Sequence, residues 1–342
     1  MSEAAVPKPE NLDPRSPDFG FRDAQGHWRP PYPVKMAPLF SWPIRPLAIL
    51  KWLFGWPGYL WPINALFALL ALLTWNFFQP PLALARSLAP GWIALMLLRN
   101  WILWWLVAGS LHLVLYKLKL HGTRRKYHPQ FLSPPNGKFL FKNQAIDNTV
   151  RSSLLGVPFW TAYEVLYVWG AANSCWPYLD PALHPLWFVA LFLLIPLWRE
   201  FHFYWIHRLI HWKPLMRTVH RVHHLNPNPG PWTGLAMHPV ELLLYFSVTA
   251  ISFVVPTHPL HFFFNSQLTA LTPAMGHHGF EGPLFNGKLV TGSYFHYLHH
   301  RFVGCNYGEA TVPLDKWFGS LYDGTGKFAT KKAQGSALQN PE

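Results

Sequence analysis

The sequence predicts an all-α fold: a multi-pass transmembrane helical bundle of about four to six crossings with a cytoplasmic helical cap that carries a histidine-rich dimetal site. The chain is 51% hydrophobic and only 13% charged, whereas ordinary soluble domains carry about 25% charged residues. Long apolar runs alternate with short basic or proline-rich segments, and histidines gather in tight clusters where such runs end. Together these features indicate an integral membrane protein with its polar chemistry at one face.

The strong positive charge does not indicate a nucleic-acid partner. The formal net charge is +13, but the basic residues lie beside apolar runs, as in cytoplasmic loops of membrane proteins, and no nucleic-acid-binding motif is present. Cys175 and Cys305 form neither a disulfide framework nor a CxxC metal site. The first 40 residues are polar and rich in proline, so no signal peptide is expected.

The first half of the chain is expected to anchor the protein in the membrane. Strong spans cover residues 59–79 and 92–116, and each is long enough to cross a hydrocarbon core about 30 Å thick. Arg99 and His112 interrupt the second span and are expected to face the bundle interior or to snorkel. The expected regions are a polar tail with an interfacial segment (1–57), transmembrane spans with a basic loop (58–184), a catalytic domain (185–323) and a C-terminal tail (324–342).

Loop charge sets the expected orientation. Residues 117–151 contain eight Lys or Arg and a single acidic residue, which places this loop in the cytoplasm by the positive-inside rule. A weaker span at 153–173 and another at 185–206 return the chain to the cytoplasmic side. The apolar region 239–276 must then cross an even number of times, turning near its break at 254–261, if all histidine clusters are to share one face.

Three histidine clusters carry the candidate chemistry. One is HxxxH, two are HxxHH, and their members are His207, His211, His220, His223, His224, His296, His299 and His300. Residues three and four apart share a helix face, so each cluster can point two or three imidazoles at one spot. Eight imidazoles are too many for one four-coordinate zinc, which favours two metal ions held close together. No cysteine lies in the clusters, so iron that activates dioxygen is preferred over softer metals.

Additional ligands are expected outside the clusters. His238 lies just before an apolar run and His277 and His278 just after one. His238 has an alternative role as a capping residue, and spacing alone does not choose between His277 and His278. Glu200, seven residues before His207, and Glu241, three after His238, are candidates to accept an N–H from a ligand imidazole.

The motifs HRLIH, HRVHH, MHPVE, HHGFEG and HYLHH, followed by NYG and DKWFG, resemble the fatty acid hydroxylase/sterol desaturase superfamily over residues 185–323. The tail elements are most similar to its sterol C5-desaturase-like branch. The resemblance implies non-heme di-iron membrane enzymes that hydroxylate or desaturate lipids with dioxygen and external electrons. It assigns the eight cluster histidines and His238 as ligands, and favours His277 over His278, which becomes an orienting residue. Glu200 stands where the family often has Asp.

We therefore expect a lipid hydroxylase or desaturase with two Fe2+ ions, dioxygen as co-substrate, and a sterol, fatty acyl or related lipid as substrate. The chain has neither a flavin-type GxGxxG nor a cysteine set for an iron–sulfur cluster. A separate electron donor, ferredoxin or cytochrome b5-like, is thus expected, docking on the basic loop 117–151. Three alternatives remain: a zinc-dependent membrane hydrolase, a non-catalytic lipid-binding or transport protein, and a multi-pass metal transporter.

Overall fold

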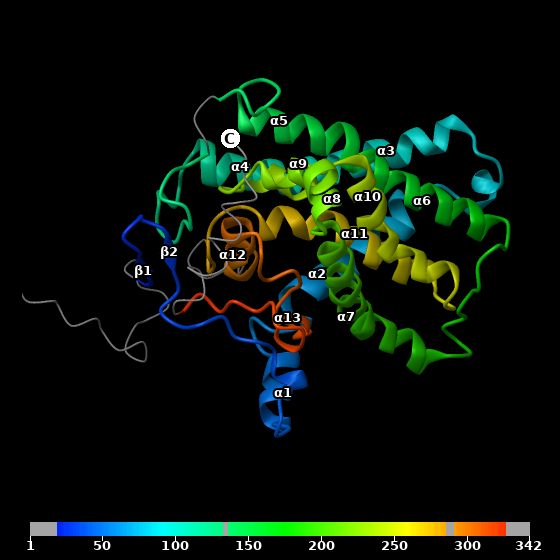
Figure 1. The fold of residues 1–342 in the computed structure, drawn as a ribbon. Coiled ribbons are helices and arrows are strands. Elements are labelled where there is room, and N and C mark those ends of the chain that lie inside the picture. Colours follow the sequence, from blue (N-terminus) through cyan, green and yellow to red (C-terminus); the bar gives the residue numbers. More distant parts are fainter. Residues whose placement is uncertain (1–18, 133–135, 285–290, 326–342) are drawn as a thin grey trace, which may run out of the picture.

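The computed structural model describes residues 19–132, 136–284 and 291–325, and helices dominate this part of the chain (Figure 1). The one sheet within it is a hairpin of β1 (Phe21–Arg22) and β2 (Trp28–Arg29). The helices are α1 (Pro46–Phe54), α2 (Ala65–Leu73), α3 (Pro90–Trp104), α4 (Ser110–His112), α5 (Gln144–Arg151), α6 (Val157–Ala172), α7 (Pro185–Ile210), α8 (Lys213–Leu215), α9 (Arg221–His224), α10 (Pro239–Phe246), α11 (Pro259–Gly276), α12 (Tyr294–Phe302) and α13 (Leu314–Trp317). Short π-helical or 3₁₀-helical turns join several of these into longer runs.

Three helical runs in the described residues are long and apolar enough to cross a membrane: Leu60–Phe78, Pro90–Lys117 and Pro185–Ile210. They coincide with three of the expected spans, and the helical membrane class is confirmed. The expected weaker span at 153–173 falls in a shorter apolar helix, α6, which does not meet the same criteria. A total of about four to six crossings therefore stays a prediction.

The apolar region 239–276 forms a helical hairpin. Its first arm is α10 extended by a 3₁₀ turn to Phe253, and its second arm, α11, begins at Pro259. The chain thus turns within the segment where the sequence placed a break. His258 caps the start of α11 and His277 its end, which at 1.5 Å per residue are about 29 Å apart.

Helix α11 is the central element of the bundle. It packs against α2, α6 and α7, and Phe262, Phe263 and Phe264 on different faces are all fully buried. A helix that is buried on all its faces lies in the core of the bundle. Because α11 contacts both the N-terminal helices and the later ones, packing extends across the expected region boundary at 184/185, and that division stays a prediction.

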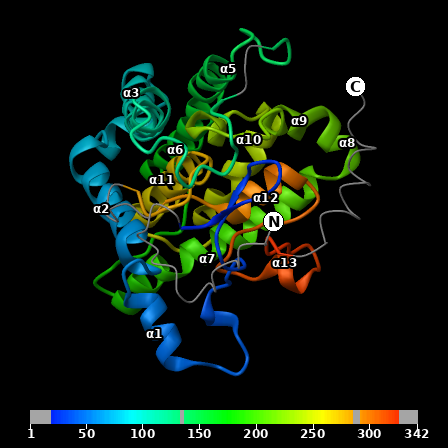
Figure 2. The same cartoon turned by 90° about the vertical axis from the view of Figure 1, so that its left-hand side faces the viewer.

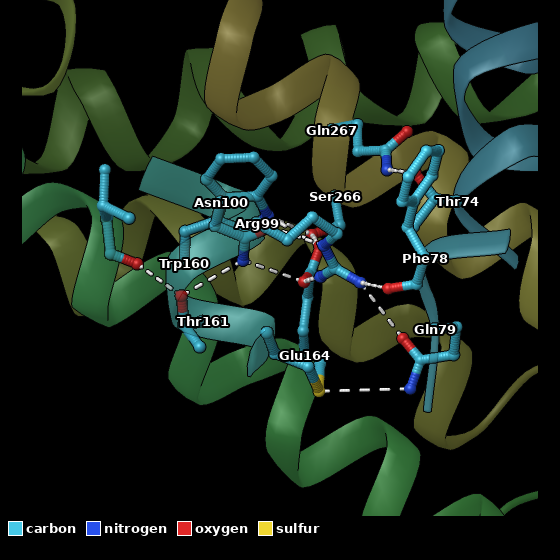
Figure 3. Close-up of polar contacts among 12 residues, drawn as sticks. Thr74, Phe78, Gln79, Arg99, Asn100, Trp160, Thr161, Glu164, Ser266 and Gln267 are labelled. Atoms are coloured by element: carbon cyan, nitrogen blue, oxygen red, sulfur yellow. Dashed lines mark hydrogen bonds and ion pairs between the residues drawn. The ribbon is translucent and has the colours of Figure 1, made fainter. Parts of the chain in front are cut away.

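A polar network lies inside the bundle between α3, α6 and α11 (Figure 3). Glu164 Oε2 accepts hydrogen bonds from the Arg99 guanidinium and from Asn100, and Oε1 accepts from Trp160 Nε1 and Ser266 Oγ at 2.7 and 2.8 Å. Arg99 therefore faces the bundle interior and is paired with a carboxylate, one of the two placements expected for it.

Figure 2 shows α2 and α3 on one side of the molecule and α8, α9 and α12 on the other.

Candidate metal centre

The structure gathers histidines from all three clusters into two neighbouring groups. In each group one nitrogen per ring lies within 4.8 Å of the others. We call these the five-histidine group (His207, His211, His220, His224, His299) and the four-histidine group (His223, His277, His296, His300).

Each HxxHH motif is divided between the groups. In the run from α8 to α9, His220 and His224 enter the five-histidine group and His223 enters the other; α12 reverses the pattern. Residues at i+3 and i+4 lie on either side of residue i around a helix, so one short helix can reach two adjacent centres. The HxxxH pair, His207 and His211, enters one group as expected, whereas each HxxHH motif sends two rings to one group and one ring to the other.

Backbone carbonyls orient four of the rings. A carbonyl oxygen can only accept, so the Nδ1 of each such ring is the donor, and in the neutral ring Nε2 carries a bare lone pair. This second partner fixes both the tautomer and the direction of a ligand imidazole. The pairs are His207 Nδ1 with Tyr307 O at 2.7 Å, His277 with Pro273 O at 2.8 Å, His299 with Cys305 O at 2.6 Å and His300 with Asn226 O at 3.1 Å.

The bare nitrogens converge within each group. Each group holds two of them: His207 and His299 in one, His277 and His300 in the other. The Nε2 of His300 is buried and has no hydrogen-bond partner among the described residues. A buried acceptor without a donor costs free energy, and a metal ion removes that cost.

The spacing also suits metal binding. Nε2 atoms of neighbouring rings lie 3.2 Å apart for His207 and His220, and 2.9 Å apart for His277 and His296. Imidazole nitrogens bind zinc at about 2.0–2.1 Å, so adjacent ligands at right angles lie about 3 Å apart. The donor set therefore fits two metal ions in adjoining positions.

Burial keeps the rings neutral. It lowers the pKa of His211, His220, His223, His224, His296, His299 and His300 well below its ordinary value, and neighbouring imidazoles lower it more. Burial also lowers the pKa of His277 to about 4. A neutral imidazole is the form that binds a metal, so these rings need lose no proton at neutral pH.

Two of the predicted histidines lie outside both groups. His238 is the N-cap of α10, where its Nδ1 accepts a hydrogen bond from Val240 N at 3.2 Å. This is the capping role left open by the sequence, so we leave His238 out of the ligand set proposed below. His278 is buried, and its Nε2 is bonded to Thr291 Oγ1 at 2.9 Å. Of the adjacent pair, His277 is the one brought to a group.

The two candidate carboxylates differ. Glu241 Oε1 lies 2.8 Å from His220 Nδ1, in the place expected for a group that orients an imidazole. Glu200 instead accepts hydrogen bonds from the backbone N–H groups of Thr311 and Val312 at 3.1 and 2.9 Å. It holds the loop beside the site rather than a ligand ring.

Sequence reasoning missed a supporting carboxylate, Asp315. Its side chain accepts hydrogen bonds from the backbone N–H groups of Tyr307 and Gly308 at 2.8 and 2.7 Å, and from Ser320 Oγ at 2.6 Å. The carbonyl of Tyr307 in turn orients His207. The sequence signal for Asp315 is the pair of elements NYG and DKWFG, which the resemblance alone had singled out. Asp315, in DKWFG, accepts a hydrogen bond from the backbone of Tyr307, in NYG.

An apolar cavity of about 250 Å³ opens beside the imidazoles. Five of the nine histidines line it: His207, His220, His223, His277 and His296. Phe203, Met237 and Tyr245 supply apolar wall, and the cavity extends to Ile63 in the first membrane span. It therefore connects a transmembrane helix with both histidine groups.

The fold and the site define a helical membrane protein with a candidate dimetal histidine centre. Residues 192–320, which include all nine grouped histidines, match the family model named fatty acid hydroxylase. The chain is 27% identical to a Delta(7)-sterol 5(6)-desaturase of Aspergillus fumigatus, over 62% of this chain and 72% of that protein. It is 28% identical to a Delta(7)-sterol-C5(6)-desaturase of Nicotiana tabacum (70% and 86% covered), and 30% identical to lathosterol oxidase of Mus musculus (40% and 50% covered).

No solved structure matches the chain. The family-model match and the sterol desaturase relatives support the resemblance to the fatty acid hydroxylase/sterol desaturase superfamily that the histidine motifs indicated. These relatives support a membrane oxidoreductase that acts on lipids.

Proposed function

We propose that this protein is a non-heme di-iron enzyme that uses dioxygen to hydroxylate or desaturate a sterol, fatty acyl or related lipid at an unactivated C–H bond. The observation that carries the proposal is the convergence of nine imidazoles into two adjoining groups beside an apolar cavity. The names of the relatives, sterol desaturases and a lathosterol oxidase, support the same reaction class.

The donor set supports iron over zinc. Zinc favours four ligands, whereas one group here offers five imidazoles. Imidazole is also a good ligand for iron, and no cysteine belongs to either group. When bound, the two metal ions would supply the reduction of dioxygen and the cleavage of the C–H bond.

The residues of the chain do the rest. The carbonyl-bonded rings and Glu241 hold the imidazoles in fixed directions, which is how ligand shells are preorganised. The largely apolar cavity would hold a lipid with a C–H bond beside His207, His223 and His296. Hydroxylation consumes one dioxygen, two electrons and two protons and yields an alcohol and one water; desaturation yields an alkene and two waters.

The electrons must come from a separate carrier, for which we propose a ferredoxin or a cytochrome b5-like protein. We also propose that the histidine centre faces the cytoplasm, since the basic loop 117–151 precedes it on that side by the positive-inside rule.

Metal and product analysis tests the proposal. Protein purified from iron-replete cells should hold about two irons per chain, as a two-metal mechanism requires. Lipids from cells that express it under ¹⁸O₂ should contain a product with one ¹⁸O atom, or one lacking two hydrogens. One zinc per chain with product formation that does not need oxygen would instead establish the hydrolase and overturn the proposal.

A further inference from the structure

The metal centre has two unlike sides. The cavity reaches the centre through His207, His220, His223, His277 and His296, and all five are buried. His211 and His224 do not line the cavity. They are the two members of the nine that remain partly exposed. Substrate and solvent therefore meet the centre from different directions.

A basic surface covers the side where His211 and His224 are exposed. Lys213, Arg217 and Arg221 are exposed and recur every fourth residue along the run from α8 to α9, so they share one helix face. His224 follows Arg221 by three residues, which keeps it close to that face. We call Lys213, Arg217 and Arg221 the basic stripe.

The charge of the basic stripe is not neutralised nearby. Residues 201–240 contain no Asp or Glu. None of the three side chains forms an ion pair with another residue in the described part of the chain. Arg208, one turn before His211, is also exposed, although it is bonded to Tyr204 Oη. Like charges without counter-charges create a positive field that attracts an acidic partner.

The basic loop 117–151 is less suited to this role. Arg125 and Lys126 are buried, and the Nζ of Lys126 donates to Asn228 Oδ1 at 3.0 Å. Arg151 pairs with Asp147 at 3.0 Å. Three of the eight cations that singled out this loop in the sequence are therefore used in internal contacts. In Figure 2 α8 and α9, which carry the basic stripe, lie at the edge of the molecule opposite α2 and α3.

We propose that the basic stripe is the docking surface of an acidic, soluble one-electron carrier, which approaches the metal centre at the partly exposed edges of His211 and His224. This inference rests on the proposed function, because only a redox reaction needs such a carrier. Each docking event oxidises one carrier by one electron, so two successive events supply the two electrons consumed with each dioxygen. The lipid occupies the cavity on the other side, so carrier and substrate do not compete for space.

Binding measurements test the inference without relying on turnover. The variant Lys213→Glu/Arg217→Glu/Arg221→Glu is reconstituted in nanodiscs of phosphatidylcholine, and its affinity for the haem domain of a cytochrome b5 and for a plant-type ferredoxin is measured at low ionic strength. We expect at least about a tenfold loss of affinity for whichever of these two carriers the wild-type protein binds more tightly, since close charge pairs govern such association. Added salt should weaken the wild-type complex and leave the variant little changed.

A matched control separates this surface from net charge. Arg124, Lys138 and Lys142 are exposed cations of the basic loop, so Arg124→Glu/Lys138→Glu/Lys142→Glu changes the charge equally and should bind within about twofold of wild type. Equal loss in both variants, loss in the control alone, or no loss in either overturns the inference. Both variants must keep the wild-type melting temperature and iron content.

Anionic lipid is the competing occupant, because Trp212 beside the stripe is also exposed, as at membrane interfaces. If the stripe variant binds carriers normally but no longer retains phosphatidylserine through purification, the surface is a lipid contact and the inference is overturned. Wild-type protein driven by ascorbate with phenazine methosulfate tests the proposed function alone. If the chemically driven wild-type protein forms product while the stripe variant binds carriers normally, the proposed function stands and only the inference about the docking surface is overturned.

Discussion

Two polar clusters lie buried in this protein, and they differ in how their hydrogen-bonding groups are matched. Around Glu164, both carboxylate oxygens receive two donors each, and the Arg99 charge is balanced. In the histidine groups, the Nε2 atoms of His207 and His220 face each other at 3.2 Å while both Nδ1 atoms are bonded to oxygen, and the Nε2 of His300 meets no donor among the described residues. A buried polar cluster is thus a candidate ligand site when its lone pairs are left over, and a structural device when donors and acceptors balance.

This comparison predicts separable effects. The Glu164 network should contribute to folding in the membrane and have little influence on the metals. The histidine groups should bind metal and contribute little to the stability of the metal-free chain, since they confront acceptors with acceptors.

The largest effect is expected from His300→Ala, which removes a bare nitrogen from the four-histidine group. Loss of an orienting partner alone costs 10–100-fold in metal affinity or activity, so loss of a ligand should lower product formation by about 100-fold or more. The metal content should fall from about two to about one ion per chain. Inductively coupled plasma mass spectrometry and lipid product analysis measure both.

His238→Ala is the matched control, because His238 caps α10 outside both groups. It should retain both metals and product formation within about threefold of wild type, the effect of a lost cap being on the order of 1 kcal/mol of stability. If His238→Ala loses metal as His300→Ala does, the division of the histidines proposed from the structure is wrong.

The second effect is expected from Glu164→Gln, which leaves the buried Arg99 without its counter-charge. Breaking a buried ion pair by removing one partner costs about 3–5 kcal/mol, so the apparent melting temperature in detergent should fall by roughly 5 °C or more. Iron per folded chain should not change. The double variant Arg99→Met/Glu164→Leu should recover much of the loss, since apolar replacement of both partners is often neutral. Metal loss without a change in melting temperature would contradict the comparison.

Much of the fold was readable from the sequence because membrane spans and histidine motifs are local patterns. The apolar runs located three spans, and the break at 254–261 located the turn before α11. The spacing of HxxxH and HxxHH located eight of the nine grouped histidines.

The remaining features depend on contacts between distant segments. Helical spacing shows that His223 and His224 diverge, but the positions of α7, α11 and α12 decide which group each enters. The carbonyls of Tyr307 and Cys305 orient ligand rings, and a backbone carbonyl has no sequence signature. The exposure of the basic stripe and the burial of Lys126 are likewise set by packing, because the two segments look equally basic in sequence.

The smallest of the three effects is the share of the pH dependence that one imidazole contributes, and it follows from the low pKa of the grouped imidazoles. Burial holds the pKa of His296, His299 and His300 well below the ordinary value in the folded chain, whereas the unfolded chain binds protons near pH 6.5. The unfolded state therefore gains protons first as pH falls, and stability present above about pH 6.5 is lost below it, at up to about 1.4 kcal/mol per pH unit for each such histidine. Metal-free wild type should melt at progressively lower temperature from pH 7 to pH 5. Metal-free His300→Ala should lose less stability over this range, by up to about 1.4 kcal/mol per pH unit, because its unfolded state binds one proton fewer. A melting temperature that stays level or rises over this range would show that the metal-free groups already hold protons, and that their leftover lone pairs are satisfied without a metal.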